Sequence, residues 1–263
     1  MFAFIYLAKM RILTLLTYRF EVFVAVGSNI IMMFATVFLW KSAYIGIDTV
    51  EGLKEQQMVT YSILSVLLST ILSCNVQNII NERVRDGQVA VDLFKPISIF
   101  VCYLADDVGR VISSLLNKAF PLLIIGIVFF GVPYPRTTIV FFAFIASCGL
   151  SFAISWLLSA LVGMMAFWVM ELGNMGRVKD AIVGALSGRL VPLWFFPTSF
   201  ITVSKYLPFQ YIYQTPLGMY IGKMSLNEAL TAMMIQGIWI IVLLSVCALV
   251  WNAAKKRVLT QGG

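Results

Sequence analysis

Residues 138–170 read TIVFFAFIASCGLSFAISWLLSALVGMMAFWVM and contain no charged side chain. An α-helix needs about 20 consecutive apolar residues to cross the hydrocarbon core of a bilayer, because each residue advances it by about 1.5 Å. This stretch is longer than that. It therefore predicts a membrane-spanning helix that tilts in the membrane or extends beyond its surface.

The composition of the whole chain agrees with this stretch. Of 263 residues, 60% are apolar and 12% are charged, and the mean hydropathy is +0.93. A soluble domain carries about 25% charged residues, and no soluble domain of this length could bury so much apolar surface. Long unbroken apolar runs predict helices rather than a barrel, whose strands alternate apolar and polar residues. We expect an all-α integral membrane protein with a single domain over residues 1–263.

Six apolar stretches are long enough to be transmembrane helices, so both termini should lie on the same side. The fifth is the least regular, because Arg189, Pro192 and Pro197 interrupt it. Residues 1–20 have no signal-peptide cleavage pattern. They predict either an amphipathic helix on the cytoplasmic face or the charged flank of the first span. The expected spans are about 21–40, 58–80, 111–131, 138–170, 182–201 and 229–251.

The basic residues predict the orientation of these spans. With Lys118 and Arg189 left out as lying inside spans, 12 Lys and Arg residues fall on the side of the termini and 5 on the other side. Because cytoplasmic loops are enriched in Lys and Arg, both termini are expected in the cytoplasm. The net charge of +7 is then a topology signal that suits contact with anionic lipid, and it does not require a nucleic-acid partner.

Several kinds of chemistry are excluded by what the chain lacks. It has no His, which excludes Ser-His and Cys-His catalysis and His-ligated metal, and no phosphate-binding loop for ATP hydrolysis. Two weak alternatives are an intramembrane aspartyl protease at Asp106–Asp107 and a catalytic Ser-Lys dyad at Ser114 and Lys118. A lysine placed like Lys118 more often snorkels to the membrane surface or pairs within the helix bundle. We therefore expect no metal and no catalytic site. The cysteines, which are most simply small buried hydrophobes, are Cys74, Cys102, Cys148 and Cys247.

Small residues recur every four positions along the fourth span, and small residues at this spacing let helix backbones approach closely. The stripe predicts a tight helix–helix seam, which can be mobile or ordinary packing within the chain. It drifts around the helix, so one straight partner cannot cover all of it. Embedded amides, by the same logic, either line a polar path or hold helices together. The stripe is Ser147, Ser151, Ser155, Ser159 and Gly163, and the amides are Asn29, Asn75, Gln77, Asn78, Asn117 and Gln236.

The loop after the second span, residues 81–98, reads NERVRDGQVAVDLFKPIS. Charges of both signs at its start are followed by Gly87 and then by a mixed apolar and polar segment ending near Pro96. Such a surface suits docking to another protein, and it equally suits a solvated loop.

Two motifs carry a resemblance to a known family. The stretch Gly87-x4-Asp92-Leu-Phe-Lys-Pro-Ile-Ser98 resembles a motif of ABC-2-type transporter permeases. The later series, in which Ser187-Gly188 precedes Val191-Pro-Leu-Trp-Phe-Phe-Pro197, Leu207-Pro-Phe209, Pro216 and Gly218, resembles the close of the same family. Length, span number and motif order extend the resemblance over essentially the whole chain.

The resemblance implies a permease subunit of an ATP-driven exporter in a bacterial plasma membrane. Two permeases, identical or homologous, would form the pathway, and two ATPase subunits would bind ATP and Mg²⁺, so that this chain binds no cofactor itself. Residues 1–20 would form an elbow helix. The expected coupling contacts are Glu82, Arg83, Arg85, Asp86 and Gly87. The re-entrant outer segment, with the expected pathway or gate residues, would contain Arg189, Pro192, Pro197, Pro208 and Pro216.

Arg189 has two interpretations, attraction of an anionic substrate or headgroup and pairing with Glu171 or Asp180. For the whole chain, the alternative function is a secondary, ion-coupled transporter. That class needs an ion site or titratable groups at the bilayer midplane, usually with inverted repeats. An intramembrane enzyme would need a reactive pair. The substrate stays open among peptides, antibiotics, lipids and glycans.

Overall fold

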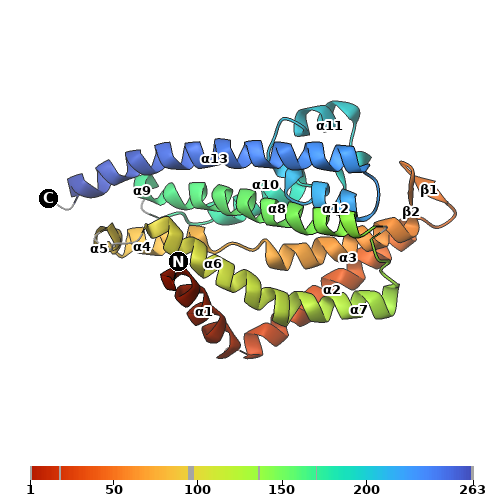
Figure 1. The fold of residues 1–263 in the computed structure, drawn as a ribbon, viewed down its shortest axis with the longest axis horizontal. Coiled ribbons are helices and arrows are strands. Elements are labelled where there is room, and N and C mark those ends of the chain that lie inside the picture. The colour runs from red at the N-terminus through yellow and green to blue at the C-terminus, as the bar shows by residue number, and fades with distance from the viewer. Residues whose placement is uncertain (1, 18, 94–97, 136, 170, 262–263) are drawn as a thin grey trace.

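The computed structural model describes residues 2–17, 19–93, 98–135, 137–169 and 171–261. About 79% of the chain is helical. Most helices run along one long axis and form an elongated bundle (Figure 1). Within the described residues, five segments are long and apolar enough to cross a membrane, judged by length and composition: Val22–Ala43, Glu55–Arg85, Ile99–Phe130, Thr138–Val169 and Leu226–Arg257.

The first half of the chain supplies three of these segments, and a short hairpin joins the first two. The hairpin turn uses positive φ at Glu51 and Gly52, a conformation that glycine adopts without strain. The elements are α1 (Phe2–Thr17), α2 (Arg19–Ala43), β1 (Thr49–Val50), β2 (Leu53–Lys54), α3 (Glu55–Ile71), α4 (Val76–Arg85), α5 (Val89–Leu93), α6 (Ile99–Ser114), the π-helix η1 (Leu115–Ala119) and α7 (Phe120–Phe130).

The second half is built around two long helices that pack side by side, α8 and α13. Shorter helices and irregular backbone lie between them in the chain. The elements are α8 (Thr138–Met164), α9 (Ala166–Val169), α10 (Met175–Leu186), the 3₁₀ turn η2 (Leu193–Phe195), α11 (Thr198–Ser204), the 3₁₀ turn η3 (Phe209–Tyr211), α12 (Gln214–Tyr220) and α13 (Leu226–Gln261).

Different elements lie at the two ends of the bundle (Figure 1). At one end lie the β1–β2 hairpin, the end of α7 and the start of α13; we call this the hairpin end. The side chain of Gln56 fixes two elements there by donating to the carbonyls of Phe130 (3.0 Å) and Gly131 (2.9 Å). At the opposite end lie α4, α5, α9 and the C-terminus, and we call this the α4 end.

The fifth expected span, about 182–201, which Arg189, Pro192 and Pro197 interrupt, does not form one membrane-spanning helix. Helix α10 ends at Leu186, and irregular backbone with two short helical turns follows. Gly188 has φ +79°, and Pro192 and Pro197 have no backbone N–H to continue a helix. Helices α8 and α13 both run from the hairpin end to the α4 end, so the chain between them returns through α10 and this irregular segment (Figure 1).

Two other span boundaries differ from the prediction. The third span begins at Ile99 rather than near 111, so that Asp106, Asp107 and Arg110 lie within a long helical segment instead of a loop. The second span, expected as one helix over 58–80, breaks between α3 and α4. Sequence reasoning placed charges outside the membrane segments and missed that buried partners satisfy them.

Helix α3 is the centre of the core. Nearly all of its residues from Met58 to Thr70 are buried, and α2, α7, α12 and η1 pack around it. Tyr61, Ile63 and Met58 are among the largest fully buried side chains of the protein. The outward faces of α2, α7, α8 and α13 instead carry exposed Phe, Leu, Ile and Val, as a lipid-facing surface does. The chain is a multi-pass membrane protein.

Candidate functional site

The break between α3 and α4 is held by one buried carboxylate. Asp107 of α6 is fully buried, and its carboxylate accepts the backbone N–H groups of Asn75 (2.9 Å) and Val76 (3.1 Å). It also accepts the indole N–H of Trp156 (3.1 Å) and lies 3.6 Å from the Arg110 guanidinium. A helix N-terminus has unpaired N–H groups and a partial positive charge, so a carboxylate there both caps α4 and binds it to α6 and α8.

Helix α4 is clamped on its other sides as well. A Cβ atom on Gly163 of α8 would lie 2.9 Å from the Cα of Gln77, so the two backbones touch. A Cβ atom on Gly176 of α10 would lie 2.5 Å from the Gln77 amide nitrogen. The side chain of Asn81 accepts the backbone N–H of Leu172 (3.1 Å). These contacts leave little room for α4 to move independently of α8 and α10.

The predicted coupling residues lie at the C-terminal end of α4, at the α4 end of the bundle (Figure 1). Glu82, Arg85, Asp86 and Gly87 are exposed, and Gly87 has φ +68° where the helix stops. Arg83 instead points back into the loop, where it pairs with Asp92 (3.7 Å) and donates to the side chain of Gln88. The motif residues Phe94 to Ile97 lie outside the described residues.

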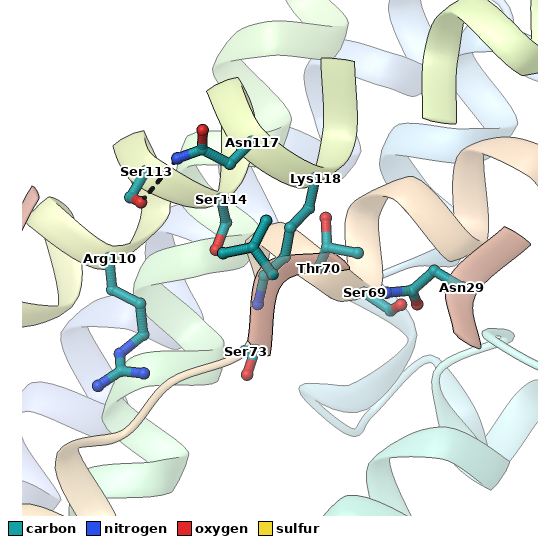
Figure 2. Close-up of a pocket in the computed structure, with 10 residues that line it drawn as sticks. Asn29, Ser69, Thr70, Ser73, Arg110, Ser113, Ser114, Asn117 and Lys118 are labelled. Carbon is teal, nitrogen blue, oxygen red and sulfur yellow. Dashed lines mark hydrogen bonds between the residues drawn. The ribbon is translucent and has the colours of Figure 1, made fainter. Parts of the chain in front are cut away.

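A polar cavity of about 230 Å³ lies between α2, α3, α6 and η1 (Figure 2). Two cations, Arg110 and Lys118, line it, and none of the described residues that line it is acidic. Within the cavity wall, Asn117 donates to the Ser113 hydroxyl (3.2 Å). The remaining lining residues are Val22, Asn29, Ser69, Thr70, Ser73 and Ser114.

The π-helix η1 explains why Lys118 reaches this cavity. Pro121 has no backbone N–H, and its ring would collide with the carbonyl of Asn117 in a regular α-helix. The chain widens to a π-helix over Leu115–Ala119 just before it. Single π-turns inside α-helices are frequent at functional sites. Figure 2 shows the Lys118 side chain directed from η1 into the cavity.

Two further cavities adjoin the first, and all three share Ser69 as a lining residue. One measures about 60 Å³ and the other about 370 Å³, and Arg189 lines both. The larger is also lined by Lys179 and Asp180. Together the three form a polar furrow along α3 in which basic side chains outnumber acidic ones.

Arg189 does not form the ion pair that was one of its two interpretations. Among the described residues, no pair joins it to Glu171 or Asp180, and Asp180 instead pairs with Lys179 (2.9 Å). Its carbonyl accepts the Ser65 hydroxyl of α3 (2.7 Å), and its side chain lies in contact with Tyr213. The guanidinium therefore faces the furrow.

The irregular backbone around Arg189 is satisfied by neighbouring side chains. Tyr61 donates to the carbonyl of Gly188 (2.6 Å), and the Gln214 side chain accepts the N–H of Leu193 (2.7 Å). Non-helical backbone at membrane depth is tolerated only where protein or a cavity covers it, and this segment fits that rule. Of the predicted gate prolines, Pro192, Pro197 and Pro208 each precede a short helix or turn, and Pro216 is buried within α12.

The stripe of small residues on α8 meets a different partner at each step. The amide of Gln236 on α13 bonds to Ser147 and Ser151, and it also donates to the carbonyl of Tyr211 (2.8 Å). Ser155 donates to the carbonyl of Leu72 beside the α3–α4 break (3.3 Å). Lys179 of α10 donates to Ser159 (2.8 Å), and Gly163 touches α4. These are contacts within one chain.

Sequence reasoning missed the role of Asp107 and the polar furrow. Asp107 was weighed only as part of an unsupported aspartyl pair, because nothing local indicates that its partner is a helix start more than thirty residues earlier. Lys118, Arg110 and the serines of α3 were visible as polar residues in or near apolar runs. Their convergence depends on how α2, α3 and η1 pack, which spacing alone does not give.

Comparison with known proteins agrees with the membrane architecture. The family model described as ABC-2 family transporter protein matches residues 30–262, which is most of the chain. No curated protein and no solved structure matches. The match includes the α3–α4 break, the irregular segment after α10 and every residue that lines the furrow except Val22 and Asn29. The chain therefore belongs to the ABC-2 family of transporter proteins, as a permease-type membrane subunit.

Proposed function

We propose that this chain is the permease subunit of an ATP-driven exporter, and that a separate ATPase subunit docks on the exposed C-terminal end of α4. The observation that carries the proposal is the combination of exposure and rigidity in α4. Its last turn presents Glu82, Arg85 and Asp86 to solvent, while its first turn is bound by Asp107 to α6 and α8. A docked protein that pushes on α4 therefore pushes on two transmembrane segments.

The proposed cycle follows from this linkage. ATP and Mg²⁺ bind on the ATPase subunits, two of which serve a pair of permeases, either two copies of this chain or one copy and a homologue. Closure of the ATPases displaces α4. Because α4 touches α8 at Gly163 and α10 at Gly176, the displacement reaches the walls of the furrow. The furrow then opens toward the hairpin end, and the substrate leaves the cytoplasm or the inner leaflet.

The topology completes the proposal. The return from α9 to α12 through α10 and the irregular segment would make a sixth crossing, which places both termini in the cytoplasm of a bacterial cell. Helix α1 would lie at the membrane surface as an elbow. It is held against α6, where a Cβ on Gly109 would lie 2.6 Å from the carbonyl oxygen of Ala8, and by an ion pair between Arg11 and Asp106 (3.4 Å). The segment with Pro192, Pro197 and Pro208 would close the outer exit.

The test is affinity purification of the tagged protein in mild detergent, with mass spectrometry of the proteins that accompany it. We expect an ATPase subunit. The double charge reversal Glu82→Lys with Arg85→Glu should remove it, because both side chains are exposed and Arg85 pairs only with the adjacent exposed Asp86 among the described ion pairs. The matched control is Arg177→Glu, an exposed charge on α10.

Three outcomes are informative. Loss of the ATPase only in the α4 variant supports the docking surface. Retention of the ATPase in that variant places the docking surface elsewhere. A stable chain with no ATPase partner would argue against the exporter and for an ion-coupled transporter, to be tested with ion gradients.

A further inference from the structure

The position of Lys118 along its helix places it deep in the membrane-spanning region. Lys118 is twelve residues from the end of α7 at Phe130, or about 18 Å at 1.5 Å per residue. Ser69 is fourteen residues from the start of α3 at Glu55, or about 21 Å. Gln56 ties these two helix ends together. By the same measure Arg110 is about 30 Å from Phe130, and Val22 begins the first candidate span, so the cavity extends from near the middle of the roughly 30 Å hydrocarbon core to its boundary away from the hairpin end.

The positive charge of Lys118 at this depth has no partner with a negative charge among the described side chains. Within the described residues, no carboxylate lies within 4.0 Å of the Lys118 ammonium, and no hydrogen bond joins it to another side chain. The Lys118 side chain is directed into this cavity, which leads toward the boundary of the hydrocarbon core away from the hairpin end (Figure 2). Lysine near the centre of a span is unfavourable on insertion scales. The Lys118 ammonium therefore leaves a positive charge in the cavity that a negatively charged ligand can balance.

The surroundings of Lys118 fit an anion with several oxygens. Arg110 lines the same cavity and pairs with Asp107 (3.6 Å), which is not among the residues that line it. The hydroxyls of Ser73 and Ser114 and the amide of Asn117 add polar groups to the wall. Arg189 lies beyond Ser69 in the adjoining cavities. Two cations, several hydroxyls and no acidic lining residue are what a phosphate group needs, and a metal cation or an amine would be repelled.

We propose that the cavity lined by Lys118 and Arg110 binds a phosphate-bearing anionic group, either the headgroup of an amphipathic lipid or a free phosphate ester. The inference rests on the proposed function in one respect, since it takes this cavity to be the substrate-binding site of the permease. Apolar side chains of α2 and α7 that lie close in sequence to lining residues Val22 and Lys118, such as Phe20, Phe23 and Phe120, are exposed on the surface of the protein. A lipid can therefore place its headgroup in the cavity and leave its chains outside.

The test uses the purified chain without any ATPase, in mild detergent, with an equal mixture of phosphatidylglycerol and phosphatidylcholine. Native mass spectrometry then counts the lipids that each protein retains. We expect selective retention of phosphatidylglycerol. Lys118→Met should weaken it about 10- to 100-fold, the range that one charge-assisted hydrogen bond gives. Lys118→Arg should retain binding. The control Lys205→Met changes an exposed cation outside the cavity and should have no effect.

A second arm separates the two sources of phosphate. If the cavity recognises the phosphate group alone, inorganic phosphate in excess should displace phosphatidylglycerol. If the cavity recognises the whole lipid, phosphatidylglycerol should stay bound. Both results support an anion site. Equal retention of both lipids with no phosphate binding, or unchanged binding in Lys118→Met, overturns the proposal. Because no ATPase is present, either of those failures leaves the docking experiment on α4 unaffected.

Discussion

Asp107 offers the sharpest test of how this fold is held together. Its carboxylate accepts three hydrogen bonds, from Asn75, Val76 and Trp156, and pairs with Arg110 at 3.6 Å while being fully buried. Removing one partner of a buried pair leaves an uncompensated charge and typically costs about 3–5 kcal/mol. We therefore expect Asp107→Ala to lower the free energy of unfolding by about that amount.

The variant Asp107→Asn removes the negative charge of the side chain and nearly keeps its shape. The amide oxygen can still accept a backbone N–H, but the amide nitrogen faces a donor and the attraction to Arg110 is lost. We expect a loss of about 1–3 kcal/mol, the cost of leaving a buried polar group unsatisfied. Both variants are measured by thermal and denaturant unfolding of the purified protein in one detergent, with tryptophan fluorescence as the signal, since Trp156 reports on the site directly.

The matched control is Asp106→Asn, one residue earlier. Its side chain is 30% exposed and pairs with Arg11 across the surface of α6. Surface pairs contribute about 0–1 kcal/mol and this pair is only partly buried, so Asp106→Asn should lose less stability than Asp107→Asn. If Asp106→Asn and Asp107→Asn were equally stable, the view that a buried carboxylate anchors α4 would be refuted. A double variant, Asp107→Ala with Arg110→Leu, should recover part of the loss because it removes both charges.

The other predictions concern close contacts and buried amides. Gly163→Ala should destabilise the protein by about 1–3 kcal/mol, because the added Cβ would press on the backbone of Gln77. The control Gly149→Ala should not destabilise it, because no atom lies within 4 Å of the added Cβ. Equal melting temperatures of the two variants would contradict the contact. Gly188→Ala should lower the free energy of unfolding by about 1–3 kcal/mol, because the residue has a positive φ and the added Cβ would crowd Gln214. Gly46→Ala has a similar φ but open space around the added Cβ, so its free energy of unfolding should fall by less. Gln236→Leu should lower the free energy of unfolding by about 1–3 kcal/mol, because it removes the acceptor of the buried Ser147 hydroxyl and one of the two donors to the carbonyl of Tyr211. A change below about 0.5 kcal/mol would argue against the network.

The fold was predictable from sequence wherever one local property decided it. The apolar run from Thr138 to Val169 forms helix almost throughout, and the long C-terminal helix contains the expected sixth span. The membrane class and the family resemblance were also correct. In each case length and apolarity within one stretch were sufficient.

The parts that could not be predicted depend on contacts between distant residues. The break after Leu72 contains no proline or glycine, and it exists because Asp107 supplies the cap for Val76 from another helix. The start of the third span was placed too late, because Asp106 and Arg110 suggested a loop. Arg189 and Pro192 did signal an irregular fifth span, but only packing against Tyr61 and Gln214 shows how its backbone is satisfied.

The central claim is that an ATPase docks on the exposed end of α4, and site-specific photocrosslinking tests it most directly. A photoreactive amino acid replaces Glu82, and in a second protein it replaces Tyr134, an 86% exposed residue in the loop between α7 and α8, near the hairpin end. The account predicts a crosslink to the ATPase subunit from position 82 and none from position 134. A crosslink from position 134, or none from position 82 in a complex that contains the ATPase, would contradict it.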